Sequence, residues 1–366
     1  MLASADVIDS QESADEGLAK DLPGVSADGD ATGFVAICGV NDKQYVAAYA
    51  PNPQKFLPDQ NPFTKQLVGA AEGAIIALTW RDDFKNKFGS DYYFGYSIEK
   101  SNYRHCTGAL IGGNRVLTAG HCLYSEFNPR HRNSGAFMRQ DLAAQYLKIE
   151  IDYDSERENN VDNRRNLYSI IGIEKFRYEW SFELDGKTDL FDFRNAEAFD
   201  PKAKYGWRVR QRPVKDFAVL NICDAPWDIE QARIAAGEDR ENVCKADATD
   251  NTMGGRQLSR HATLGLSTDN PRLESMVALI QHPAGQPKQI DTGRLDSLES
   301  NGRIGRYRHL DTLGGASGAP LLGRDGKVVG VHVAGGCKED EAGNSNIGNG
   351  AIMISVLREE APELWR

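Results

Sequence analysis

The stretch "LGGASGAPLL" occupies residues 313–322, and six of its ten residues are Gly, Ala or Ser. A run of small residues around one serine is typical of a flexible linker. It is equally typical of a backbone that must come close to a reacting group, because small side chains leave the main chain accessible. The rest of the sequence has to discriminate between these two interpretations of Ser317.

The composition is that of a globular chain rich in turns. Of the 366 residues, 40% are hydrophobic and 26% charged, and Gly occurs 36 times and Pro 14 times. This abundance of turn residues favours many short strands over a helical bundle. The formal net charge is −10 and no long Lys/Arg run is present, so we expect no nucleic-acid partner. No apolar run reaches the ~18 residues of a membrane span, so we expect no membrane insertion.

Short apolar runs separated by Gly, Asn or charged residues predict buried antiparallel strands. They lie at 74–80, 106–112, 115–120, 169–176, 216–222, 261–266, 275–282, 319–323 and 327–333. The polar stretch 126–166 predicts a solvated insertion. Residues 226–250 are rich in helix formers and predict a partly helical connection between two β units. The end of the chain predicts a helix broken by Pro362.

Three short stretches carry a His, an Asp and a Ser in that order: "VLTAGHC" at 116–122, "VKDFAVLNI" at 214–222, and the Gly-rich stretch quoted above. A serine hydroxyl is a poor nucleophile at neutral pH and needs a base, which His121 can supply. A buried carboxylate must orient that imidazole, and Asp216 can do so. Gly315 allows a turn in which its own N–H and that of Ser317 can point at one oxygen. These residues together predict nucleophilic attack on an acyl carbon.

The three stretches resemble the chymotrypsin-like serine peptidases, and more closely the bacterial glutamyl-endopeptidase branch. In that family "TAGHC" carries the general base, "DFAVL" the orienting aspartate and "GASGAP" the nucleophile. Two further stretches are typical of the bacterial branch, "IQHPAGQPKQI" at 280–290 and "GKVVGVHVAGG" at 326–336. The resemblance covers residues 72–357 in outline.

The resemblance implies an all-β fold of two antiparallel six-stranded β-barrels, with a C-terminal helix, an N-terminal extension and the active site between the barrels. We therefore expect four segments along the chain. They are an N-terminal extension and candidate pro-segment at 1–70, a first barrel with His121, Asp216 and a long insertion at 71–225, an inter-barrel linker at 226–255, and a second barrel with Ser317 and the terminal helix at 256–366.

The activity implied by the resemblance is that of a serine endopeptidase acting on proteins or peptides. His121, Asp216 and Ser317 would form the catalytic triad, and the N–H groups of Gly315 and Ser317 would bind the oxyanion. No cofactor and no metal are expected. We expect a secreted or periplasmic enzyme, although this chain shows no signal-peptide pattern. A latent enzyme blocked by residues 1–70, or a catalytically silent binding module, is the alternative.

Two features of the substrate pocket give opposite indications about the preferred side chain. The resemblance assigns Thr312 and His332 to an acidic side chain before the cleaved bond, as in glutamyl endopeptidases. Asp311 stands where trypsin carries the aspartate that binds Arg or Lys. Charge complementarity therefore leaves both specificities open. We expect the acidic one because Thr312 and His332 match together, with cleavage after Arg or Lys as the alternative.

The sequence departs from the trypsin pattern beside the nucleophile. Ala316 replaces the aspartate that pairs with a newly cut N-terminus, so a zymogen of this chain would need another switch. Leu313 replaces a cysteine of the trypsin pattern. The resemblance implies a disulfide between Cys106 and Cys122 beside His121. Among the remaining cysteines we expect the pairings Cys223–Cys244 and Cys38–Cys337, with Cys337 in another pairing or as a free thiol as the alternative.

Overall fold

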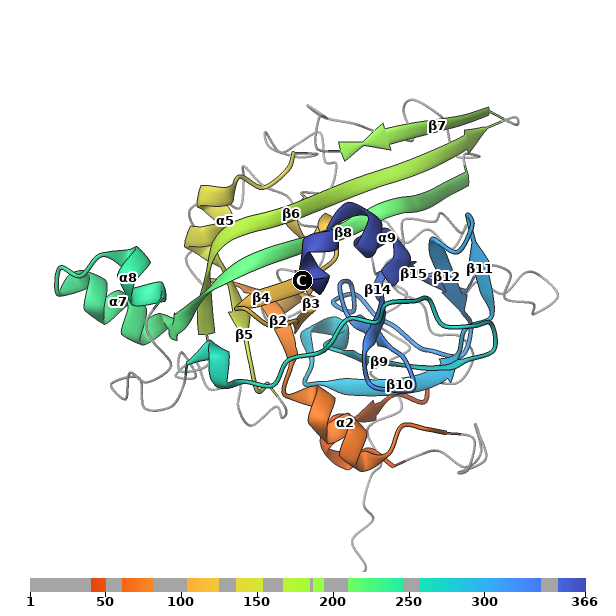
Figure 1. The fold of residues 1–366 in the computed structure, drawn as a ribbon, viewed down its shortest axis with the longest axis horizontal. Coiled ribbons are helices and arrows are strands. Elements are labelled where there is room, and N and C mark those ends of the chain that lie inside the picture. Colours follow the sequence, from red (N-terminus) through yellow and green to blue (C-terminus); the bar gives the residue numbers. More distant parts are fainter. Residues whose placement is uncertain are drawn as a thin grey trace, which may run out of the picture.

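A computed structural model describes the chain at residues 41–50, 61–81, 84, 104–124, 136–153, 167–184, 187–193, 210–245, 257–336 and 348–366. Strands make up most of the regular structure and form two antiparallel sheets, as Figure 1 shows. Cys38 and Cys337 lie outside the described residues, as does most of the expected N-terminal extension.

The first sheet has seven strands in the order β5-β2-β3-β4-β8-β6-β7, and a further pairing between β5 and β6 closes six of them into a barrel. Its strands are β2 (Ile75–Trp80), β3 (Arg104–Leu110), β4 (Arg115–Thr118), β5 (Leu147–Glu150), β6 (Leu167–Leu184), β7 (Lys187–Asp192) and β8 (Arg210–Pro226). The seventh strand, β7, pairs with β6 beyond the closed part.

The second sheet has eight strands in the order β1-β10-β9-β13-β14-β15-β12-β11. Its strands are β1 (Gln44–Tyr45), β9 (Met276–Gln281), β10 (Gln289–Arg294), β11 (Ser297–Glu299), β12 (Ile304–Tyr307), β13 (Pro320–Leu322), β14 (Val328–Ala334) and β15 (Asn349–Met353). The short strands β1 and β11 lie at the two ends of this order, so six strands form its central part. The mostly β architecture and the closed six-stranded barrel confirm the expected fold class.

In the described part of the chain, helices are few and short. The α-helices are α2 (Lys65–Glu72), α5 (Gln140–Tyr146), α7 (Trp227–Ala235), α8 (Arg240–Cys244) and α9 (Ile354–Glu360), and 3-10 helices span Val46–Ala48, Gly120–Leu123, Leu258–Arg260, Pro283–Gly285 and Pro362–Trp365. α7 and α8 lie in the stretch where the sequence predicts a partly helical connection. α9 and the following 3-10 helix are interrupted at Ala361, directly before Pro362, because proline cannot donate the next helical hydrogen bond.

The apolar runs that predict strands become the core. Every residue of β2, β3 and β9 is buried, so both faces of these strands lie in the interior and neither faces solvent. The largest apolar cluster includes Ile76 of β2 and Val331 of β14, which belong to different sheets. The two sheets therefore share one buried interior, and each can hold part of a site at their junction.

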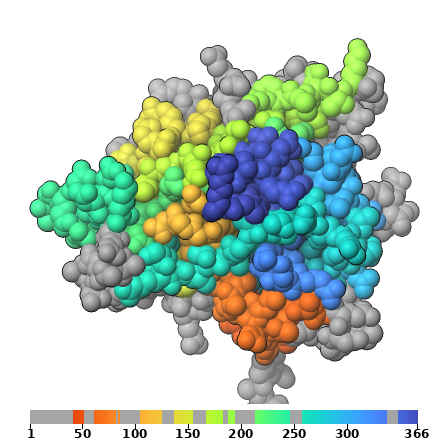
Figure 2. All heavy atoms as spheres, viewed as in Figure 1, coloured from red at the N-terminus to blue at the C-terminus, as the bar shows by residue number. Residues whose placement is uncertain are grey.

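β6 and β8 continue well beyond the apolar runs that predicted them. They pair with each other over most of their length and, with β7, form a ribbon that extends from the barrel in Figure 1. α9 lies against the base of this ribbon: Glu360 contacts Arg177 of β6 at 2.7 Å and Lys215 of β8 at 2.8 Å. Figure 2 shows the C-terminal segment on the surface between atoms of the two sheets.

Two expectations about local structure are wrong. The stretch 261–266 forms no strand and contributes only an isolated bridge between Leu266 and Val328. β5 lies inside the stretch expected to be a solvated insertion, yet all its residues are buried and it closes the barrel. The polar appearance of that stretch comes from its flanking residues, whereas "LKIE" alone is too short to indicate a barrel strand.

Candidate active site

The three residues expected to act together are placed by different elements. His121 lies in the 3-10 helix Gly120–Leu123, which follows β4, and Asp216 lies inside β8. Ser317 lies in the turn before β13. A side chain at Gly120 would meet the carbonyl oxygen of Arg177 at 2.1 Å, so only glycine lets the histidine segment pack this closely on β6.

Asp216 holds His121 through both of its carboxylate oxygens. Oδ1 accepts the backbone N–H of His121 at 2.9 Å, and Oδ2 lies 2.8 Å from the ring nitrogen Nδ1. Asp216 is fully buried, while 9% of the His121 side chain is exposed. Because a carboxylate can only accept here, Nδ1 carries the ring hydrogen and Nε2 of the neutral imidazole is left as a proton acceptor.

Ser317 lies in the second of two consecutive tight turns. Ala316 N–H donates to Leu313 O at 2.9 Å, and Ala319 N–H donates to Ala316 O at 2.9 Å. The third residue of each turn, Gly315 and Gly318, has a positive φ of 97° and 85°, respectively. A positive φ at this position alone defines a type II turn and requires glycine. The Gly-rich sequence therefore encodes a fixed backbone path rather than a flexible linker.

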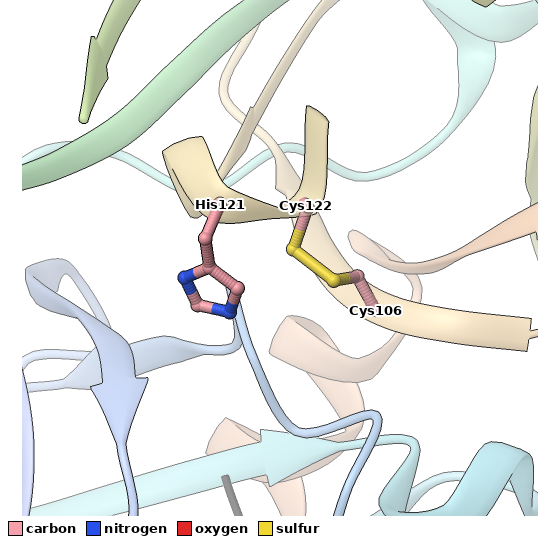
Figure 3. A group of neighbouring side chains, drawn as sticks. All are labelled: Cys106, His121 and Cys122. Carbon is pink, nitrogen blue, oxygen red and sulfur yellow. A yellow bond between two sulfur atoms is a disulfide. The ribbon is translucent and has the colours of Figure 1, made fainter. Parts of the chain in front are cut away.

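The backbone of the Ser317 turn is bonded directly to the barrel that carries His121. Thr107 N–H of β3 donates to Ser317 O at 2.8 Å, and Cys122 Sγ lies 3.8 Å from the same oxygen. Cys122 follows His121 in the chain and forms a disulfide with Cys106, as Figure 3 shows. The serine turn and the histidine segment therefore meet on β3.

Two N–H groups in the serine turns are left for an external acceptor. Within the part of the chain that the structure describes, neither Gly315 N–H nor Ser317 N–H donates to a protein acceptor. Both residues are buried, with Ser317 3% exposed. Buried amide N–H groups are nearly always paired, so a pair of this kind is suited to a ligand oxygen.

His332 is fully buried on β14 and joins the serine turn through its backbone: Gly318 N–H donates to His332 O at 2.8 Å. Its Nδ1 lies 2.5 Å from the hydroxyl of Tyr307, and its Nε2 has no partner among the described residues. Burial lowers the pKa of His332 to about 3, and the electrostatic interaction with nearby His121 acts in the same direction. His332 is therefore neutral at physiological pH.

Thr312 and Asp311 lie on the same segment but face different surroundings. Thr312 is fully buried, and its hydroxyl lies 3.3 Å from Asn349 Oδ1. Asp311 is 2% exposed, and its carboxylate accepts the backbone N–H of Asp42 at 3.1 Å. Its own backbone N–H donates to Asp291 at 2.7 Å. The residue that trypsin would use for a basic substrate side chain is thus bonded to the N-terminal part of this chain.

Acidic, histidine and cysteine side chains gather in three places in the described part of the chain. Two of the groups, Cys106–His121–Cys122 and Cys223–Glu230–Cys244, contain a disulfide, so their sulfur atoms are not thiolate ligands for a metal. The third group brings the carboxylates of Asp42, Asp291 and Asp311 within 4.8 Å of one another. Backbone N–H groups of Asp42 and Asp311 donate into this third group.

Sequence reasoning missed three residues that contact the expected site. Thr107 bonds the serine turn through both its N–H and its hydroxyl, Tyr307 contacts His332, and Ala284 N–H donates to Gly314 O at 2.5 Å. Thr107 follows Cys106 directly, so its place beside the expected disulfide was the available signal. Nothing near Tyr307 or Ala284 in the sequence indicates these contacts.

Comparison with known proteins gives one family. The model of the trypsin-like peptidase domain matches residues 106–331, which include His121, Asp216 and Ser317. No curated protein matches the chain. Among the helices of the described residues, none has the length and apolar character needed to cross a membrane.

Solved structures similar to this chain include proteases at low sequence identity. A serine endoprotease from Yersinia pestis is 11% identical with a TM-score of 0.40, over 83% of this chain and 68% of that one. A Glu endopeptidase is 18% identical with a TM-score of 0.35, over 78% of this chain and 95% of that one.

Proposed function

The chain belongs to the trypsin-like peptidase domain family, and from that membership we propose that it is a serine endopeptidase with His121, Asp216 and Ser317 as its catalytic triad. Membership of the family makes proteins or peptides the substrates. The observation that carries the triad is the double hydrogen bond from His121 to buried Asp216, beside a serine whose turn has two N–H groups with no acceptor among the described residues.

Each residue has one task in the proposed reaction. The hydroxyl oxygen of Ser317 attacks the peptide carbonyl while Nε2 of His121 takes the hydroxyl proton. The charge that forms on the carbonyl oxygen is stabilised by the N–H groups of Gly315 and Ser317. His121 then gives its proton to the departing amine, which leaves an ester on Ser317. Water attacks this ester with His121 again as the base, and the acid product and free Ser317 result.

Asp216 contributes orientation and charge. Its two hydrogen bonds fix both the backbone and the ring of His121, so the imidazole cannot rotate away from its working direction. Its negative charge stabilises the imidazolium that forms after proton transfer. Because Asp216 is fully buried, its interaction with that imidazolium is stronger than it would be in water.

The pocket around His332 supports an acidic side chain before the cleaved bond. When Tyr307 donates its hydroxyl hydrogen to Nδ1, the hydrogen of neutral His332 sits on Nε2, which has no partner in the described part of the chain. Nε2–H is then a donor for a substrate carboxylate. Asp311 is less suited to a basic side chain because its carboxylate already accepts the N–H of Asp42.

The described part of the chain contains two disulfides, Cys106–Cys122 and Cys223–Cys244. They agree with the secreted or periplasmic location expected from the sequence. Disulfides persist in secreted and periplasmic proteins and are rare in the cytosol. We therefore propose secretion or a periplasmic location for this protein.

Chemical labelling of the full chain tests the proposal. A phosphonofluoridate should react with Ser317 of the wild-type protein and not with the S317A variant, and mass spectrometry locates the adduct. A peptide library, digested by the same two samples, should be cut by the wild type alone, mainly after Glu or Asp. Folded wild-type protein that neither reacts nor cuts any peptide, both as the full chain and after removal of its N-terminal extension, would refute the enzyme and favour the silent binding module. Cutting mainly after Arg or Lys would refute the specificity alone.

A further inference from the structure

The two donor N–H groups of the serine turn belong to peptide units that are fixed at their other ends. The unit from Gly314 to Gly315 has its carbonyl bonded to Ala284 N–H at 2.5 Å, and its N–H is the first donor. The unit from Ala316 to Ser317 has its carbonyl bonded to Ala319 N–H at 2.9 Å, and its N–H is the second donor. The unit between them joins the two donors and so sets the angle between them.

That middle unit, from Gly315 to Ala316, is fixed by the opposite barrel. Its carbonyl oxygen accepts the hydroxyl of Thr107 at 2.7 Å, and its N–H donates to Leu313 O at 2.9 Å. Thr107 is fully buried, so no water can easily replace its hydroxyl. If this bond were lost, the middle peptide could rotate about its Cα atoms and the two donors would change direction.

The hydroxyl of Thr107 makes a second hydrogen bond, in which it is the acceptor. It accepts the backbone N–H of His282 at 3.0 Å while donating to Gly315 O. His282 precedes the 3-10 helix Pro283–Gly285, which supplies the N–H of Ala284 for Gly314. One side chain of β3 therefore connects the serine turn to the loop that holds the turn from the other side.

The glycines of this turn are packed too closely against neighbouring backbone for a larger residue to replace them. A Cβ at Gly315 would meet His282 O at 2.6 Å, and a Cβ at Gly318 would meet Thr107 O at 2.2 Å. The N–H of Thr107 also donates to Ser317 O at 2.8 Å. Its neighbour Cys106 is joined by a disulfide to Cys122, beside His121 (Figure 3). The same short segment of β3 thus contacts both the histidine segment and the serine turn.

We propose that Thr107 is a positioning residue, whose hydroxyl holds the peptide between the two oxyanion donors and keeps the N–H groups of Gly315 and Ser317 directed at one oxygen. This inference rests on the proposed peptidase function and goes beyond it by assigning a role to a residue of the first barrel that touches no substrate. Thr107 acts through the backbone of the serine turn, so its loss weakens stabilisation of the oxyanion more than binding of the substrate.

The test compares T107V, which keeps the shape and removes the hydroxyl, with T107S, which keeps the hydroxyl. T79V is the matched control, because Thr79 is also a buried threonine of the first barrel but its hydroxyl contacts Trp80 O and not the serine turn. In T107V we expect kcat to fall by about 10- to 100-fold with KM within about threefold, since one oxyanion donor is worth roughly 10²–10³ in kcat. T107S should recover kcat to within about threefold of wild type.

A binding measurement separates positioning from loss of stability. A peptide boronate mimics the tetrahedral intermediate, whereas the cleaved peptide product does not. T107V should lose affinity for the boronate about as much as it loses kcat, and its affinity for the product should stay unchanged. If folded T107V keeps kcat within about threefold of T79V, the proposal is overturned. If T107V does not fold, T107A takes its place with the same comparisons.

Amide hydrogen exchange keeps this proposal distinct from the peptidase proposal. If the wild type neither cuts peptides nor reacts with the phosphonofluoridate, the proposed function fails while Thr107 can still be tested. The amides of Gly315 to Ser317 should then exchange about tenfold faster in T107V than in T79V, because a freed peptide rotates more readily. Equal exchange rates in the two variants would overturn the role of Thr107 whether or not the protein is an enzyme.

Discussion

Asp216 contacts His121 twice, at the backbone N–H and at ring nitrogen Nδ1, with distances of 2.9 and 2.8 Å. Because of these two bonds, the position of the His121 imidazole depends on one buried side chain of β8. They also divide the role of the carboxylate into a part that holds the backbone and a part that sets the hydrogen on the ring.

Replacing Asp216 with Asn separates these two parts. The D216N side chain can still accept the backbone N–H, but its amide can present a donor to Nδ1 and so favour the wrong ring tautomer. We expect kcat to fall by about 10⁴ while the protein stays folded. D224N is the control, because Asp224 is a buried aspartate of the same strand that bonds Ser259 instead. A kcat of D216N within tenfold of wild type would contradict the triad.

Tyr307 should control the preference for an acidic substrate side chain. In Y307F the ring of His332 loses its hydroxyl partner at Nδ1, so the hydrogen can occupy either ring nitrogen. We expect kcat/KM for a Glu substrate to fall about tenfold relative to the matching Gln substrate, in line with about 1.4 kcal/mol for one hydrogen bond. Y168F, which removes a buried hydroxyl next to His261, should leave the ratio unchanged. An unchanged ratio in Y307F would remove His332 from the pocket.

The two disulfides should differ in their effect on activity. Each closes a loop of similar length, with sequence separations of 16 and 21, so each contributes about 3 kcal/mol to the free energy of unfolding. The double variant C106A/C122A should also lower kcat, because that disulfide lies beside His121 and Thr107. C223A/C244A should keep kcat, since the disulfide that it removes only joins α8 to β8. Denaturant unfolding and kinetics on both variants check this, and an equal loss of kcat in both would count against it.

Acid should destabilise the protein through three buried histidines. Burial lowers the pKa of His105 to about 4 and the pKa values of His282 and His332 to about 3. Their pKa in the unfolded chain is about 6.5, so the unfolded state binds more protons between pH 6.5 and pH 4, and stability falls as the pH falls through this window. Near pH 5 these three groups contribute a slope of up to about 4 kcal/mol per pH unit.

The midpoint of urea unfolding, followed from pH 7 to pH 4.5, measures this slope. H105Q removes one of the three groups and keeps a donor for Cys122 O, so its slope should be about one third smaller. A slope that is the same in H105Q and wild type would mean that His105 is protonated in the folded protein.

The N-terminal residues should be separable at a position earlier than the boundary expected from the sequence. Phe63, Val68 and Ala71 belong to the main apolar cluster, and Tyr49 donates its hydroxyl to Phe63 O at 2.9 Å. We expect a chain lacking residues 1–40 to unfold at nearly the same urea concentration as the full chain with the C38A substitution, so that a disulfide of Cys38 is absent from both. Removing residues 1–72 should cost about 5 kcal/mol or more, because it empties a buried Phe and Val site. Equal stability of the two truncated chains would support a dispensable extension that ends at residue 70.

The sequence allowed the core strands and the identity of the chemistry to be predicted, but not the supports of the site. Apolar runs located β2, β3, β4 and β9, because burial requires apolar side chains wherever the strand lies. The runs did not give the length of β6 and β8, since the outer parts of these strands are held by pairing within the ribbon rather than by burial.

The histidine and aspartate of the site could be proposed only because their neighbours resemble a known family. The hydroxyl contact from Thr107 to Gly315 spans 208 positions, and the contact from His282 to Thr107 spans 175. Contacts this far apart in sequence leave no local pattern, because any residue with a hydroxyl or an N–H could occupy either end. The type II turns are the exception, since the glycines that they require are visible in "LGGASGAPLL".

The ion pairs of Glu360 have a consequence for how the molecule is made. Burial would raise the pKa of Glu360, but hydrogen bonds from Lys215 and Arg177 lower it below its ordinary value, so the carboxylate is charged and bound to both. Lys215 immediately precedes Asp216 in β8. During synthesis the ribosome therefore releases the aspartate strand long before its electrostatic partner. A nascent chain that stops before residue 360 therefore lacks the ion pairs of Glu360 with Arg177 and with Lys215, the neighbour of Asp216.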